Sequence, residues 1–212
     1  MSPTAQTATA DTVPETIPAL PTEDALRANT WSLLAALLAA PPGDELLGLL
    51  RQIDPSTEGE GAMAVHWRLL RLASEHSGAA QINDEYHDCF VGISRGELMP
   101  YGSWYLTGFL MDRPLAQLRA DLTRLGIARQ GDVHEPEDHI AALCEVMAIL
   151  ISEGGHDALA FQSSFFAQHI APWAGAFFRD VQQARSANFY RSVGGLGEVF
   201  MATEQQYLAM LV

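Results

Sequence analysis

The segment HEPEDHIAALCEVMAILI, residues 134–151, carries the clearest helical pattern in the chain. Its large apolar residues recur at intervals of three and four, which is the spacing of one buried helix face; they are Ile140, Leu143, Cys144, Met147, Leu150 and Ile151. Pro136 is tolerated in a first helical turn, where Glu137 and Asp138 would place negative charge that the helix dipole favours. The segment therefore predicts a buried helix that begins near Pro136.

The same helical spacing recurs along the chain, and no segment shows the period-two alternation of a β-strand. The expected helices cover residues 22–40, 44–50, 62–77, 79–91, 113–125, 136–153 and 157–169, followed by one from Pro172 and a last one over 188–212. Gly194, Gly195 and Gly197 are expected to interrupt the last helix. The sequence thus predicts an all-α fold, a single helical domain of about nine to ten helices that forms one unit or two packed halves.

Composition also suggests where this domain begins and where it could bend. Residues 1–21 contain four prolines among Thr and Ala without apolar periodicity, so we expect a disordered N-terminal tail before a helical domain over 22–212. The polar connector 128–134 is the expected hinge. No secretory signal is visible, and the longest apolar run, 33–40, is far below the roughly 20 residues that cross a bilayer. We therefore expect a cytoplasmic protein without membrane insertion.

The charge balance and the cysteine count exclude several function classes. The net charge is -14, and all 12 basic residues are Arg. Such an acidic chain is a poor general nucleic-acid binder, because phosphates need a basic surface, but it suits a cationic partner. Cys89 and Cys144 are the two cysteines, too few for a disulfide framework or a zinc cluster.

Catalytic motifs are either incomplete or wrongly spaced. His134 and His139 are five positions apart with Pro136 between them, whereas the zinc-protease motif needs histidines four apart on one helix face. A phosphate loop of the GxxxxGK type is excluded because the chain has no Lys. Asp138 beside His139 could still act as an acid–base pair. A helical enzyme that uses these two residues therefore stays open as an alternative.

An aromatic cluster in a Gly- and Pro-rich segment suggests recognition. Residues 92–105 include Tyr101, Trp104 and Tyr105, although loops usually lack large apolar side chains. Together with the Pro-acidic-His sequence of 135–139, they predict a rigid, apolar and negatively charged surface. It would suit an extended peptide with arginines beside hydrophobic residues, because carboxylates pair with guanidinium groups and aromatic faces stack on them. A small apolar ligand at the aromatic segment is the second alternative.

Several motifs, in this order, resemble the TorD/DmsD/NarJ family of redox-enzyme maturation proteins. They are Tyr86-x-x-x-Phe90, MPYGSWY at 99–105, EPEDH at 135–139, Phe165-x-x-x-His169-Ile170-x-Pro172-Trp173 and Phe189-Tyr190, and the similarity covers about residues 24–210. The resemblance implies a cytoplasmic chaperone that is not an enzyme and has no cofactor of its own. Such a chaperone binds the precursor of a molybdopterin-containing oxidoreductase, often at its twin-arginine leader, and assists cofactor insertion before export.

The resemblance also implies a binding site and a partner. In the family the aromatic segment and the Pro-x-Asp-His segment face one groove, so the implied client-binding residues are Tyr101, Ser103, Trp104, Tyr105, Glu135, Pro136, Asp138 and His139. The continuation over 107–119 resembles members linked to formate dehydrogenases. We therefore expect the catalytic-subunit precursor of a formate dehydrogenase-like or DMSO reductase-like enzyme as the client. Family members are monomers or domain-swapped dimers, and 128–134 would be the hinge of a swap.

Overall fold

A computed structural model describes residues 22–53, 61–92, 96–129, 135–153 and 158–210. These residues form α1 (Thr22–Ala39), α2 (Asp44–Gln52), α3 (Ala62–His76), α4 (Ala79–Tyr86), η2 (His87–Val91), α5 (Gly102–Thr107), α6 (Arg113–Arg124), α7 (Ile140–Ser152), α8 (Ala158–Phe165), η3 (Phe166–Ile170), α9 (Ala174–Gln183) and α10 (Phe189–Met210), where η marks a π-helical turn. The predicted all-α fold is confirmed. The predicted tail, 1–21, and residues 130–134 of the predicted hinge lie outside the described residues.

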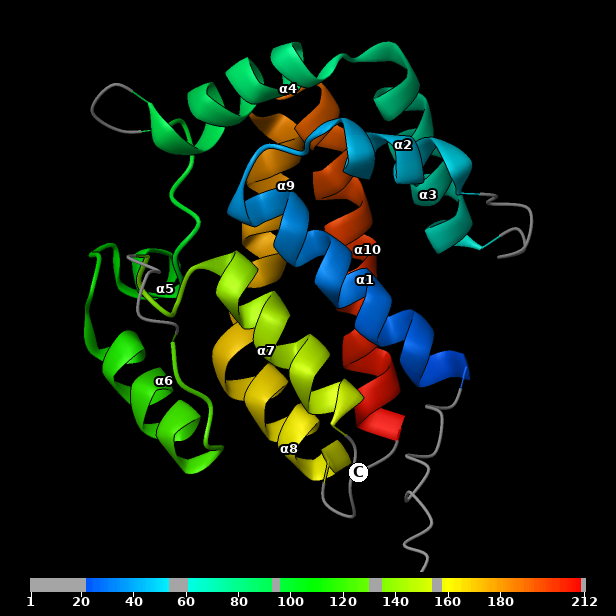
Figure 1. The fold of residues 1–212 in the computed structure, drawn as a ribbon. Helices are drawn as coiled ribbons and strands as arrows, with labels where there is room; N and C mark the ends of the chain where they lie inside the picture. The colour runs from blue at the N-terminus through cyan, green and yellow to red at the C-terminus, as the bar shows by residue number, and fades with distance from the viewer. Residues whose placement is uncertain (1–21, 54–60, 93–95, 130–134, 154–157, 211–212) are drawn as a thin grey trace, which may run out of the picture.

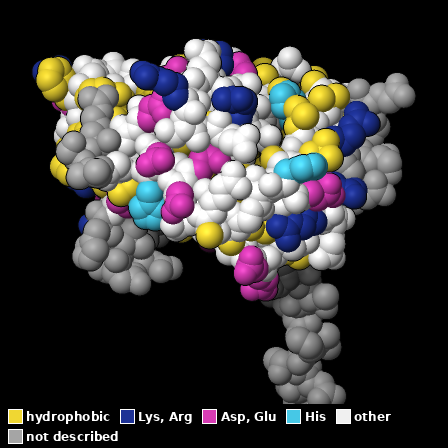
Figure 2. All heavy atoms as spheres, turned by 90° about the horizontal axis from the view of Figure 1, so that it is seen from above, with side chains coloured by type: hydrophobic (Ala, Val, Ile, Leu, Met, Phe, Trp, Pro, Cys, Tyr) yellow, Lys and Arg dark blue, Asp and Glu magenta, His cyan; other side chains and the backbone are white. Residues whose placement is uncertain are grey.

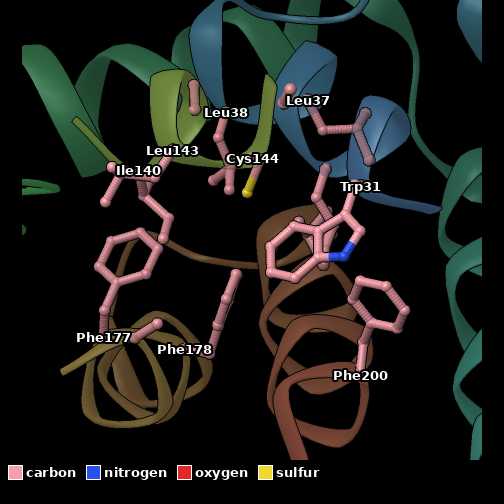
Figure 3. Packing of buried hydrophobic residues seen from close by; sticks show 14 of the residues in the cluster. Trp31, Leu37, Leu38, Ile140, Leu143, Cys144, Phe177, Phe178 and Phe200 are labelled. Carbon is pink, nitrogen blue, oxygen red and sulfur yellow. The ribbon is translucent and has the colours of Figure 1, made fainter. Parts of the chain in front are cut away.

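Helices α1 and α7 lie side by side and run in opposite directions, with α9 and α10 behind them (Figure 1). Side chains from all four helices meet in the core, including Trp31, Leu143, Phe177 and Phe200 (Figure 3). The apolar spacing of residues 140–151 thus does bury α7, as the sequence predicted. Helices α2, α3 and α4 flank one side of this core, and α5 and α6 lie at the opposite edge (Figure 1).

The predicted interruption of the last helix is wrong, because α10 runs continuously from Phe189 to Met210. Its glycines lie where neighbouring helices approach closely. A Cβ atom on Gly197 would lie 2.3 Å from the Phe178 ring of α9, and one on Gly195 would lie 2.6 Å from Nδ1 of His66 on α3. Glycine weakens an exposed helix, but here it permits helix contacts that a larger residue would block.

The start of α7 also differs from the prediction. The helix begins at Ile140, four positions after Pro136, and His139 is its N-cap in an extended conformation. Residues 136–138 form a turn, closed by the hydrogen bond from the N–H of His139 to the carbonyl of Pro136 at 3.1 Å. Glu137 and Asp138 therefore precede the helix. The segment expected to be irregular, 92–105, contains most of the short helix α5.

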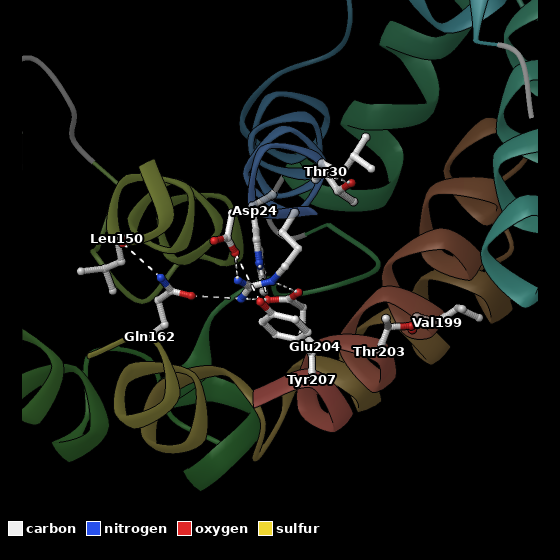
Figure 4. Close-up of polar contacts among 11 residues, drawn as sticks. Asp24, Thr30, Leu150, Gln162, Val199, Thr203, Glu204 and Tyr207 are labelled. Carbon is white, nitrogen blue, oxygen red and sulfur yellow. Dashed lines mark hydrogen bonds and ion pairs between the residues drawn. The ribbon is translucent and has the colours of Figure 1, made fainter. Parts of the chain in front are cut away.

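A buried ion pair joins the first and last helices. Arg27 of α1 donates to both carboxylate oxygens of Glu204 on α10, at 2.7 and 2.9 Å (Figure 4). The indole Nε1 of Trp31 donates to the same carboxylate at 3.0 Å, and the Arg27 guanidinium lies 4.1 Å from the centre of the Tyr207 ring. These contacts satisfy a charge pair inside the helical core, as buried charges require.

No described helix is both long enough and apolar enough to span a bilayer.

Candidate functional site

An isolated antiparallel bridge between Tyr101 and His139 joins the aromatic segment to the EPEDH motif. The N–H of Ile140 donates to the carbonyl of Pro100, and the N–H of Gly102 donates to the carbonyl of Asp138, both at 2.9 Å. The rings of Tyr101 and His139 meet edge to face with centroids 5.1 Å apart. The two motifs are therefore hydrogen-bonded neighbours on one surface, and not the two facing walls of a groove.

Ser103 and Asp138 lie beneath this surface. Ser103 is 0% exposed and Asp138 is 3% exposed. Oδ2 of Asp138 accepts a hydrogen bond from the N–H of Ser103 at 2.7 Å, whereas Oδ1 has no hydrogen-bond partner among the described residues. The backbone N–H of Ser103 thus orients the carboxylate of Asp138. A buried carboxylate oxygen without a donor is costly, so its presence needs an explanation.

His139 is held as a neutral side chain. Burial lowers the pKa of its imidazole to about 4, an effect that the nearby Glu135 and Asp138 carboxylates only partly oppose. Its Nδ1 accepts the N–H of Ala141 at 3.2 Å and so caps α7. Asp138 bonds to Ser103 and not to the imidazole. This geometry gives the acid–base alternative no support.

The aromatic members of the site are anchored and half-buried. Tyr101 donates its hydroxyl to the carboxylate of Glu135, and Tyr105 donates to Asp180 at 2.8 Å. The Tyr105 ring also packs on Trp173, with centroids 5.4 Å apart. Burial and these hydrogen bonds raise the pKa of both phenols above the ordinary tyrosine value. Both phenols therefore remain protonated, and their rings form a rigid surface.

The Tyr101–His139 bridge lies between two hollows. The first, which we name the Asp138 cavity, has a volume of about 260 Å³, and its lining includes Gly102, Thr107, Arg113, Gln117, Asp138 and Gln168. The second, the Glu135 groove, has a volume of about 460 Å³, and its lining includes Leu122, Ile127, Glu135, His139, Glu145 and Val146. Asp138, the last residue of the turn, lines the first hollow, and His139, the bridge residue, lines the second.

The Glu135 groove combines an apolar floor with carboxylates. Glu135 and Glu145 are exposed at its edge. Glu137 is instead paired with Arg119 at 2.8 Å. Burial would raise the pKa of Glu137, but the hydrogen bond from Arg119 and the nearby Arg129 hold it below the usual value. On the face seen in Figure 2, acidic side chains are interspersed with Arg and His.

Sequence reasoning missed an exposed apolar turn beside the site. Phe109 and Met111 follow α5, and each is 71% exposed. Met111 has a positive φ of 57°, which is unusual for a residue with a side chain, and its N–H donates to Oγ of Ser103 at 3.1 Å. The signal in the sequence was the run of large apolar residues after Gly108. Sequence reasoning also missed Glu145 and Leu122, since α7 and α6 supply them from outside the motifs.

Comparison with known proteins decides the family. The family model described as the nitrate reductase delta subunit matches residues 57–179, a range that contains every residue lining the Asp138 cavity. The chain belongs to this family. The family membership predicted from the motifs is thereby confirmed. Within the described residues of this family member, no cluster of three His, Cys, Asp or Glu side chains could hold a metal ion.

Individual relatives agree with this membership. The chaperone protein TorD of Aliivibrio fischeri is 28% identical over 152 residues, which cover 67% of this chain and 71% of that protein. The Tat proofreading chaperone DmsD of Haemophilus influenzae is 27% identical over 168 residues, covering 76% of this chain and 81% of that protein. A candidate redox enzyme maturation protein from Archaeoglobus fulgidus aligns with 93% of this chain and 99% of its own, at 14% identity and a TM-score of 0.48, too distant to carry weight.

Proposed function

We propose that this member of the nitrate reductase delta subunit family is a maturation chaperone for a molybdopterin-containing oxidoreductase. Family membership and the relatives named as chaperones TorD and DmsD support this function. It acts by binding its client in the cytoplasm before the client is exported, and not by catalysis. The client is the precursor of a catalytic subunit of the formate dehydrogenase or DMSO reductase kind, and the chaperone is a monomer or a domain-swapped dimer.

The Glu135 groove is the proposed binding site for the client's twin-arginine leader. The observation that carries this proposal is the apolar floor edged by the exposed carboxylates of Glu135 and Glu145. Burial of the leader's hydrophobic stretch would supply most of the affinity, at roughly 25 cal/mol for each Å² removed from water. The carboxylates would attract the arginines and so add rate and selectivity, an effect that salt weakens.

The aromatic residues extend this binding site toward α5. The ring of Tyr101 is half-buried, and its hydroxyl donates a hydrogen bond to the carboxylate of Glu135. Trp104 is also half-buried, and it lies on the same short helix as Tyr105. An arginine that pairs with Glu135 could therefore lie against an aromatic face, which strengthens the pairing of a guanidinium. Pro136 helps to fix the turn that presents Glu135.

Titration calorimetry with a leader peptide tests this assignment. The double variant Glu135→Gln and Glu145→Gln should bind about fivefold more weakly at low salt, because two exposed ion pairs together contribute on the order of 1 kcal/mol. The matched control is Glu45→Gln with Asp84→Asn, which removes two exposed charges on α2 and α4. Equal binding by the wild type and the Glu135 and Glu145 variant would contradict the groove, and no binding by the wild type would contradict leader recognition altogether.

A second candidate function is the binding of a small apolar ligand. The feature that favours it is a cavity outside the aromatic segment. A cavity of about 630 Å³ lies among α1, α2, α3 and α10, and its mostly apolar lining includes Leu33, Leu49, Trp67 and Phe200. Its size and lining are typical of ligand sites. Native mass spectrometry of the purified protein tests this function, since a co-purified apolar molecule would support it and a bare chain would count against it.

A further inference from the structure

We propose that the Tyr101–His139 bridge sorts the two adjacent arginines of the leader, so that one guanidinium enters the Asp138 cavity while the other lies in the Glu135 groove. This inference rests on the proposed function and deepens it. It explains why a client leader would need two neighbouring arginines, because each one meets a different carboxylate.

The first supporting observation is the unused hydrogen-bonding capacity of Asp138. Its Oδ2 is occupied by the N–H of Ser103, while Oδ1 is buried and has no donor among the described residues. Asp138 lines a cavity of about 260 Å³ whose other walls include exposed residues such as Leu106 and Gln117, so the cavity is open to the surface. A buried carboxylate that lacks a donor, on a residue that lines a cavity, suits a guanidinium, which carries five N–H donors and a charge.

The second observation is that residues at and beside the bridge line two different hollows. Asp138 and Gly102 line the cavity, whereas His139 and Glu135 line the groove. Consecutive side chains of an extended peptide also point to opposite sides. An extended leader lying across the bridge would therefore direct two adjacent arginines into the two hollows, and two arginines separated by one residue would point to the same side.

Arg113 provides an internal check on the charge of the guest. Its exposed side chain lines the Asp138 cavity, and the structure shows no ion pair between it and Asp138 among the described contacts. A positive charge at the wall of the cavity opposes the entry of a guanidinium. Replacing Arg113 with Gln should therefore strengthen binding of a leader that places an arginine in this cavity.

The test is a set of binding measurements with four leader peptides that differ only at the arginine pair, namely Arg-Arg, Arg-Gln, Gln-Arg and Arg-Ala-Arg. They are titrated into the wild type, Asp138→Asn, Glu135→Gln and Arg113→Gln. Asp138→Asn keeps an acceptor for the Ser103 N–H, and thermal unfolding shows whether it folds. Arg68→Gln is the control for Arg113→Gln, since it removes an exposed arginine on α3, at the other side of the core.

The proposal predicts opposite patterns for the two carboxylates. Asp138→Asn should weaken one singly substituted peptide by about tenfold or more and leave the other unchanged, and Glu135→Gln should show the reverse preference with a smaller effect. Arg113→Gln should tighten the Arg-Arg peptide about threefold, whereas Arg68→Gln should leave its affinity unchanged, and Arg-Ala-Arg should bind more weakly than Arg-Arg.

The outcomes separate this inference from the proposed function. If Arg-Arg binds but both carboxylate variants weaken both singly substituted peptides equally, the leader binds and the sorting is wrong. If Arg113→Gln has no effect on the Arg-Arg peptide, no arginine enters the Asp138 cavity, even where Asp138→Asn does not fold. If no peptide binds the wild type, the proposed function itself fails in its leader part.

Discussion

The carboxylate of Glu85 accepts a hydrogen bond from the backbone N–H of Tyr190 at 2.7 Å, across 105 positions of sequence. The same carboxylate also accepts the N–H groups of Asn188 and Phe189. The first N–H groups of a helix have no partner within it, and here a buried acid from α4 satisfies those at the start of α10. A side chain of one helix thus fixes the position of the longest helix in the core.

Replacing Glu85 with Ala should therefore destabilise the protein by roughly 3 kcal/mol, because two buried N–H groups and one partly buried N–H group would lose a charged acceptor. Urea unfolding of the variant measures this loss directly. Asp84→Ala is the matched control, since Asp84 is the exposed neighbour on the same helix and should change stability by less than about 0.5 kcal/mol. Similar losses in both variants would show that Glu85 does not hold α10.

The glycines of α10 allow a second comparison. Gly197→Ala should cost about 1–3 kcal/mol, because the new Cβ would lie 2.3 Å from the fully buried ring of Phe178. Gly48→Ala on α2 should instead stabilise by about 0.5–1 kcal/mol, since nothing lies within 4 Å of the added Cβ. Thermal unfolding of both variants checks the two signs. A Gly197→Ala protein as stable as the wild type would contradict the close packing of α9 on α10.

The neutral imidazole of His139 makes stability depend on pH. Its pKa is about 4 in the folded protein and 6.5 when unperturbed, so between these values the unfolded chain binds the proton more readily. Stability should therefore fall as the pH drops from 6.5 to 4, by about 3 kcal/mol from this residue alone. His139→Asn keeps a capping acceptor and cannot titrate there, so its unfolding free energy should fall less over the same range. Parallel pH profiles for the two proteins would contradict a buried neutral His139.

Local patterns predicted the helices well and their limits less well. The three- and four-residue apolar spacing of residues 140–151 is a property of one helix face, so it predicted the burial of α7 correctly. The start of that helix depends on the distant hydrogen bond from Ile140 to Pro100, which no local pattern contains. Gly197 predicted a break because glycine is a poor helix former. In the structure it lies within the helix, where the missing side chain allows close packing against Phe178.

The candidate site divides in the same way. The motifs predicted that Tyr101 and His139 belong together, and the structure places them in one bridge. The sequence could not show that Ser103 and Asp138 are buried, because burial depends on the helices packed around them. It also could not show that neighbours in EPEDH serve two separate hollows, nor that α7 would add Glu145 to one of them.

Recognition of the two arginines can be measured by isothermal titration calorimetry at low salt, in which a twin-arginine leader peptide is compared with the same peptide carrying two glutamines. We expect the arginine peptide to bind at least about tenfold more tightly, which corresponds to about 1.4 kcal/mol, and we expect added salt to reduce this difference in affinity. Equal affinity for both peptides would contradict charge recognition at the Glu135 groove and the Asp138 cavity.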